Sequence, residues 1–186
     1  MLWSIAIAFP WVVFCSYWLW GALGTKRSVE KEPFWSRYGV LAMEASGYVL
    51  VFTNWGHFWR GEIFPQTLAV ALAGVACTWA GVGLAVWARW HLGKYWSARI
   101  TLKEGHELIR TGPYARLRHP IYTGLDLAAL GGLLAIDEWR CGAGWCLIVT
   151  GYILKARREE SLLAAQFGQK FEEHRRRTGF LFPKLR

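Results

Sequence analysis

The sequence predicts an all-α integral membrane protein with about five transmembrane helices in a single membrane domain, residues 1–186. Hydrophobic residues make up 54% of the chain and the mean hydropathy is +0.18, which is more apolar than an ordinary soluble domain. Many of the 13 tryptophans stand near the ends of long apolar runs, as is typical of membrane interfaces. A large aromatic core in a soluble protein is the alternative, but such proteins seldom carry this many long uncharged runs.

The distribution of basic residues is the third observation that predicts this fold class. Of the 22 lysines and arginines, four lie in residues 25–37, seven in residues 89–118 and nine between Lys155 and the C-terminus. This partition follows the positive-inside rule, so we expect the N-terminus outside and the C-terminus in the cytoplasm. The net charge of +9 then reflects topology and attraction to membrane lipids, and no nucleic-acid partner is predicted.

Five apolar runs are the predicted spans: residues 2–23, 38–59, 66–88, 121–136 and 141–154. The first run is long enough to cross about 30 Å of hydrocarbon. A signal peptide is the competing interpretation of this run, but it lacks a basic n-region and a clear cleavage site. The third run contains Gly74, Gly81 and Gly83, and small residues of this kind let helices pack closely in lipid.

The last two predicted spans are short and are joined by residues 137–140, which indicates a tight helical hairpin with its turn outside. After the hairpin, residues 155–186 are polar with apolar positions at helical spacing, so we expect an amphipathic helix on the cytoplasmic surface. The four cysteines form no CxxC pair and have no histidine at ligand spacing. They are predicted to be packing residues, and no metal site is predicted.

Two polar segments, residues 92–120 and 155–186, are predicted to form one cofactor site at the membrane surface. In the first, Arg118 and His119 precede Pro120, which is favourable in a first helical turn, so free N–H groups and basic side chains can bind a carboxylate there. A helix start with snorkelling basic residues is the alternative. In the second segment, Glu159 or Glu160 can accept ribose hydroxyls, although adjacent acids among arginines can also be solvated ion pairs.

The C-terminal half of the sequence resembles the isoprenylcysteine carboxyl methyltransferase family and the related membrane phospholipid N-methyltransferases. The matching motifs are LGKYWS, GHELI at residues 105–109, GPYxxxRHPIYTG, the EE pair and TGxLFPK. The resemblance implies an S-adenosylmethionine-dependent methyltransferase whose cofactor lies between the last two spans and the polar segments. The residues that the resemblance places against the cofactor are His106, Glu107, Leu108, Ile109, Tyr114, His119, Pro120, Ile121, Tyr122 and Glu159.

The acceptor of the methyl group is expected to be a lipophilic molecule or lipid that reaches the site from the bilayer. Glu44 and Asp126 lie inside predicted spans, where a carboxylate is costly and usually functional. They are predicted to bind or deprotonate an amine, so N-methylation is the expected reaction, while a hydrogen bond to a neighbouring helix is the alternative for each acid. Lys155 stands where the resembled family has an arginine linked to substrate binding, which makes it a candidate substrate residue.

Three other functions compete with an amine methyltransferase. Carboxyl O-methylation of an isoprenylcysteine is the activity of the resembled family itself. Membrane sterol reductases have a similar C-terminal region that binds NADPH, but their additional phosphates would require more basic residues than residues 155–160 offer. A non-catalytic membrane scaffold would have no need for two cofactor-like polar segments.

Overall fold

The computed structural model describes residues 2–22, 34–53, 61–96 and 107–184, and within these ranges the regular elements are all helical. The α-helices are α1 (Leu2–Ala22), α2 (Phe34–Phe52), α3 (Leu68–Leu92), α4 (Pro120–Ile136), α5 (Trp139–Phe167) and α6 (Gln169–Arg177). Two short 3-10 helices, η2 (Gly93–Tyr95) and η3 (Gly112–Ala115), lie between α3 and α4. The predicted all-α class is therefore confirmed.

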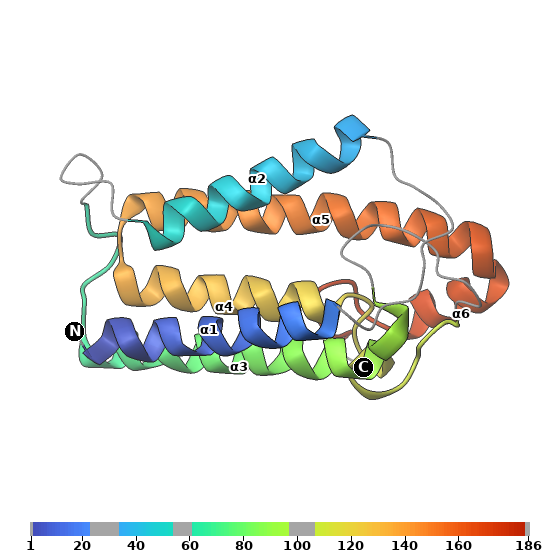
Figure 1. Cartoon of the computed structure of the whole chain (residues 1–186), viewed down its shortest axis with the longest axis horizontal. Helices are drawn as coiled ribbons and strands as arrows, with labels where there is room; N and C mark the ends of the chain where they lie inside the picture. The colour runs from blue at the N-terminus through green and yellow to red at the C-terminus, as the bar shows by residue number, and fades with distance from the viewer. Residues whose placement is uncertain (1, 23–33, 54–60, 97–106, 185–186) are drawn as a thin grey trace.

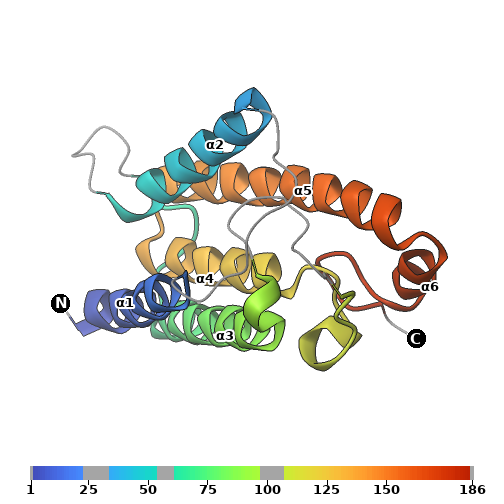
Figure 2. The same cartoon turned by 45° about the vertical axis from the view of Figure 1, so that its right-hand side comes forward.

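The long helices form one elongated bundle in which α1, α3, α4 and α5 run side by side and α2 crosses α5 at an angle (Figures 1 and 2). α4 packs most extensively against α3, and α5 packs most extensively against α2. At one end of the bundle α5 extends beyond its neighbours and turns into α6 (Figure 1). This end also receives the polar segment that precedes α4 and the one that follows α5, so the fold gathers the candidate site residues there.

Apolar helices dominate the described part of the chain. Within that part, α3 alone is both long and apolar enough to cross a membrane by itself. Ile5–Gly21, Tyr38–Phe52 and Pro120–Ile136 are apolar helical stretches below that length. Large apolar side chains such as Phe9, Leu72 and Trp79 are exposed on the outside of the bundle.

Glycines bring α3 and α4 into backbone contact. A Cβ atom added to Gly81 would lie 2.4 Å from the backbone N of Ala128 and 2.4 Å from the carbonyl oxygen of Gly124. Gly74 makes a similar contact, because a Cβ atom added to it would lie 2.8 Å from the carbonyl oxygen of Gly131. The close packing predicted for the third apolar run is thus confirmed, and α4 is its partner.

α5 differs from the predicted fifth span in length. The apolar composition ends at Leu154, but the helix continues through the polar residues 155–167 and stops only at Gly168, which has φ +50°. Residues 155–167 contain good helix formers and no proline, so a change in polarity did not end the helix. The separate helix that follows the bundle, α6, is consequently shorter than predicted.

The helical hairpin of α4 and α5 turns at Asp137. This residue ends α4 in the left-handed conformation, with φ 53°. Its Oδ1 atom accepts hydrogen bonds from the backbone N–H groups of Ile63 and Phe64, at 3.0 and 3.2 Å. The turn therefore also holds the segment that leads into α3.

Candidate active site

A cavity of about 980 Å³ lies between α1, α2, α4 and α5 and extends to the segments that precede α4 and follow α5. Its lining changes character along its length. One part, the aromatic end, is lined by Trp11, Phe14, Tyr48, Phe52 and Tyr152. The other part, the charged end, is lined by Glu107, Arg118, His119, Glu159 and His174.

Pairing of two distant segments builds the charged end. The backbone N–H of Arg118 donates to the carbonyl of Gly179, and the N–H of Gly179 donates to the carbonyl of Arg116, both at 2.9 Å. The hydroxyl of Thr123 donates to the carbonyl of Leu181 at 2.8 Å. Residues 116–123 and 179–181 therefore hold each other in register at the start of α4.

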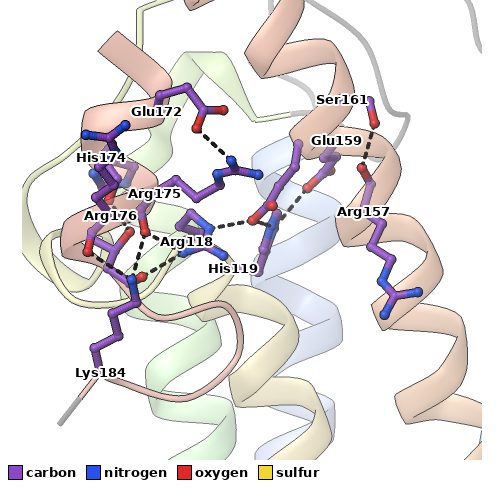
Figure 3. A network of polar contacts seen from close by, with 12 residues as sticks. Arg118, His119, Arg157, Glu159, Ser161, Glu172, His174, Arg175, Arg176 and Lys184 are labelled. Carbon is purple, nitrogen blue, oxygen red and sulfur yellow. Dashed lines mark hydrogen bonds and ion pairs between the residues drawn. The ribbon is translucent and has the colours of Figure 1, made fainter. Parts of the chain in front are cut away.

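Arg118 and His119 make ion pairs with the two adjacent glutamates of α5 (Figure 3). His119 Nδ1 lies 3.4 Å from Glu159 Oε2, and His119 Nε2 lies 3.2 Å from Glu160 Oε1. Arg118 Nε donates to the same oxygen of Glu160, and Arg118 Nη1 donates to the backbone carbonyl of Thr178 at 2.6 Å. These four side chains thus join the start of α4 to the extension of α5 and to the C-terminal segment.

Burial and pairing shift the pKa values of this cluster in opposite directions. Burial disfavours charge on His119, but its hydrogen bonds to Glu159 and Glu160 prevail and raise its pKa. Burial likewise acts against the charge of Glu159, yet the hydrogen bonds from His119 and Tyr122 hold its pKa below the usual value. Burial and the positive charges of Arg110 and Arg118 lower the pKa of His174.

Aromatic rings connect the two ends of the cavity. The His119 ring stacks on Tyr122 with centroids 5.7 Å apart, and Tyr122 stacks on Tyr152 at 4.9 Å. The Tyr122 hydroxyl donates to Glu159 Oε1 at 2.7 Å, and the Tyr152 hydroxyl lies 3.0 Å from the hydroxyl of Tyr48. A ligand in this cavity therefore meets charged groups at one end, a row of ring faces and edges beyond them, and apolar surface at the other end.

Residues 74–165, which include α4 and most of α5, match the model of the isoprenylcysteine carboxyl methyltransferase (ICMT) family. Over this region the chain is similar to the ICMT family. ICMT-family proteins are integral membrane proteins that use S-adenosylmethionine as methyl donor.

Two bacterial proteins are similar to the chain, one over most of its length and the other over half of it. The cobalt-zinc-cadmium resistance protein CzcN of Cupriavidus metallidurans is 29% identical over 167 residues, which is 87% of this chain and 70% of that protein. The nickel-cobalt-cadmium resistance protein NccN of Alcaligenes xylosoxydans xylosoxydans is 33% identical over 97 residues, which is 50% of this chain and 45% of that protein. The first match extends beyond the ICMT region, so the likeness also includes N-terminal helices.

Most of the predicted cofactor residues line the cavity. The described lining residues among them are Glu107, Leu108, Ile109, Tyr114, Arg118, His119, Ile121, Tyr122 and Glu159. Pro120 occupies the first turn of α4 and Glu160 binds Arg118, and neither residue lines the cavity. His106 lies outside the described residues.

The predicted substrate residues separate into two groups. Lys155 lines the cavity, with its Nζ 5.4 Å from the ring centre of Tyr122. Glu44 lies 3.8 Å from Lys155 Nζ as an ion-pair partner, and its side chain is outside the cavity lining. Asp126 also lies outside that lining, and its Oδ1 atom is buried without a hydrogen-bond partner among the described residues.

Sequence reasoning missed the contributions of the first two helices and of α6 to the cavity. Trp11 and Tyr48 come from α1 and α2, and Phe171 and His174 come from α6. A signal existed for Tyr48 and Tyr152, because Tyr48 is four residues after Glu44 and Tyr152 three residues before Lys155. These spacings place each pair on one helix face.

We expect the stability of the folded protein to depend on pH through His119. A raised folded pKa means that its contribution is fully present below the ordinary value of 6.5 and is lost as pH rises through the folded pKa. The thermal unfolding midpoint of the wild type in detergent should therefore fall above about pH 6.5, relative to the midpoint of His119→Gln. His174 acts in the opposite sense, since its folded pKa is lowered, so the difference between the two proteins is the informative quantity.

A difference between wild type and His119→Gln that stays constant from pH 6 to pH 9 would contradict this prediction. At acid pH the stability of the folded protein changes in the opposite direction and falls as pH falls. Glu159 and Glu160 have lowered pKa values, so their contribution is present above 4.5 and is lost as pH falls through their folded pKa values.

Proposed function

We propose that this protein is an S-adenosylmethionine-dependent membrane methyltransferase that methylates the carboxylate of a lipophilic molecule. The observation that carries the proposal is the cavity itself, which joins a charged end, formed mostly by residues of the ICMT-like region, to an apolar, aromatic end. A charged cofactor fits the first environment and a lipophilic acceptor fits the second. The proposal includes five spans, with the N-terminus outside and the charged end on the cytoplasmic side.

The residues at the charged end fit the chemistry of S-adenosylmethionine. Glu159 has oxygen lone pairs left after accepting from His119 and Tyr122, because a carboxylate has about four acceptor sites. These lone pairs suit ribose hydroxyls, while Arg118 and His119 suit the carboxylate of the cofactor. Tyr114 and Phe171 offer buried ring surface for adenine.

When bound, S-adenosylmethionine supplies a methyl group on a sulfonium, which the acceptor takes directly as the carbon–sulfur bond breaks. The chain's own residues therefore have to bind, align and exclude water rather than act as nucleophiles. Tyr122 is well placed for this role, because it touches Glu159 by its hydroxyl and Tyr152 by its ring face. Its ring can also stabilise a nearby cation.

The polar groups of the cavity favour a carboxylate over the amine predicted from the sequence. Lys155 is a cation in the cavity lining, whereas the acids Glu44 and Asp126 are not in that lining. Glu44 already has Lys155 as an ion-pair partner, so it is less available to an incoming ammonium. N-methylation stays a prediction, and carboxyl O-methylation also agrees better with the ICMT family.

Methyl transfer from labelled S-adenosylmethionine to matched lipophilic carboxylates and amines tests the proposed function. We expect the wild type to methylate N-acetyl-S-prenylcysteine at its carboxylate. Lys155→Met should lower kcat/KM for this acceptor about tenfold or more, because a hydrogen-bonded charge pair is lost, while Lys155→Arg should retain most activity. The affinity for S-adenosylmethionine, measured by calorimetry, should change less than threefold in both variants.

Each competing function predicts a different result. If the wild type transfers methyl groups only to the amine, and Lys155→Met retains that activity, the protein is an amine methyltransferase and not a carboxylate methyltransferase. Binding of NADPH without binding of S-adenosylmethionine would indicate a reductase, and binding of neither would indicate a scaffold.

A further inference from the structure

Two polar contacts join α2 to α5 next to the aromatic end of the cavity. Glu44 and Tyr48 lie one turn apart on α2, and Tyr152 and Lys155 lie one turn apart on α5. Glu44 pairs with Lys155 at 3.8 Å, and the Tyr48 hydroxyl meets the Tyr152 hydroxyl at 3.0 Å. The acid of the first contact is outside the cavity lining, but both members of the second are in it.

The helices can meet in this way because glycines remove the side chains between them. A Cβ atom added to Gly151 would lie 2.7 Å from Glu44 Cγ, and one added to Gly47 would lie 2.7 Å from the carbonyl oxygen of Gly144. α2 and α5 therefore approach closely next to the tyrosine pair. Such an approach fixes the positions of Tyr48 and Tyr152, and stacking on Tyr122 further restricts the ring of Tyr152.

The tyrosine pair keeps one hydroxyl proton to donate. In a hydrogen bond between two phenols, one hydroxyl donates and the other accepts, so the accepting hydroxyl still carries its own proton. The described residues offer this second proton no other partner. A donor of this kind in an apolar cavity is costly to leave without a partner, and its position near Lys155 selects a ligand with an acceptor oxygen.

We propose that the hydroxyl pair of Tyr48 and Tyr152 binds the acceptor carboxylate together with Lys155 and thereby positions it for methyl transfer. The proposal rests on the proposed function and names two specificity-determining residues for it. One carboxylate oxygen accepts hydrogen bonds from the phenol and the ammonium. The other oxygen keeps its lone pair for the new carbon–oxygen bond, while the electrons of the broken carbon–sulfur bond stay on sulfur and no proton moves.

Tyrosine-to-phenylalanine variants test this inference with N-acetyl-S-prenylcysteine as the probe. We expect the double variant Tyr48→Phe/Tyr152→Phe to raise KM for the probe about tenfold or more, since a hydrogen bond to a charged group is lost. Each single variant should have a smaller effect, because the remaining hydroxyl can still donate. Tyr17→Phe, which alters a tyrosine of α1 outside the cavity lining, is the matched control and should behave as wild type.

A second ligand separates recognition of the carboxylate from damage to the cavity. The decarboxylated analogue of the probe keeps the prenyl chain and should inhibit the wild type and the double variant with the same inhibition constant. Equal losses for both ligands would overturn the proposal, as would a KM in the double variant within twofold of wild type.

The failure of the proposed function would give a different result. It would appear in the wild type as absent binding of S-adenosylmethionine or as transfer to amines alone, and the latter result also overturns the inference. Equilibrium binding of the probe to wild type and double variant, measured without cofactor, decides the inference even for a chain that transfers no methyl group.

Discussion

Replacing Glu159 with alanine is expected to weaken S-adenosylmethionine binding about 10- to 150-fold, the effect of losing a hydrogen bond of about 1.5–3 kcal/mol to a charged group. Glu159 is the carboxylate of α5 that lines the charged end of the cavity, and its two oxygens are oriented by Tyr122 and His119. Removing it takes away the proposed acceptor for the ribose hydroxyls. Calorimetric titration of the purified protein in detergent measures the change.

Glu160→Ala is the matched control for this experiment. Glu160 is the next residue and shares His119 as a partner, but its other partner is Arg118 and it lies outside the cavity lining. We expect its cofactor affinity to stay within threefold of wild type, while its thermal unfolding midpoint falls because Arg118 loses its carboxylate partner. Equal losses of affinity in the two variants would mean that the cluster supports the fold and does not contact the cofactor.

These neighbouring glutamates show which feature of the site the motifs could not predict. The motifs brought residues 106–122 and the EE pair into one hypothesis, and the structure does place His119 against both glutamates. Consecutive residues on a helix point about 100° apart, so two adjacent side chains need not face the same cavity. Which one faces it depends on how α5 is rotated against α4, and a motif contains no information on that rotation.

The two acids in the predicted spans illustrate a different limit. Glu44 and Asp126 were predicted to contact the acceptor because a carboxylate in an apolar span is costly. The cost is real, but for Glu44 it is offset by Lys155, a residue 111 positions away that meets it only because α2 packs on α5. Pairing across helices cannot be predicted from hydropathy, since hydropathy gives the length of each span and not its neighbours.

The class of the fold was easier to predict than its boundaries. Apolar runs and glycines indicated helices that pack closely, and Gly74 and Gly81 do meet α4. The predicted fifth span ends at residue 154, whereas the helix that contains it runs on to Phe167, because a change in polarity does not end a helix. Its last residue, Phe167, lies thirteen residues beyond Leu154, and the helix stops there because Gly168 adopts a positive φ.

Replacing Gly81 with alanine is expected to destabilise the folded protein by about 2–3 kcal/mol or more, because the added methyl group overpacks the contact between α3 and α4. The methyl carbon would lie 2.4 Å from two backbone atoms of α4, and backbone cannot move aside as a flexible side chain can. α4 begins directly after Arg118 and His119, so displacing α4 should also lower the affinity for S-adenosylmethionine. The thermal unfolding midpoint in detergent and the cofactor affinity measure the two effects.

Gly83→Ala provides the matched control, since Gly83 lies two residues further along the same helix and an added Cβ atom would meet nothing within 4 Å. The same substitution at this exposed position should be neutral or stabilising by up to about 1 kcal/mol, because alanine favours helix over glycine. Similar unfolding midpoints for the two variants would mean that α3 and α4 do not approach as closely as the structure has them. A loss in Gly81→Ala alone would support the close contact that sets the position of the charged end.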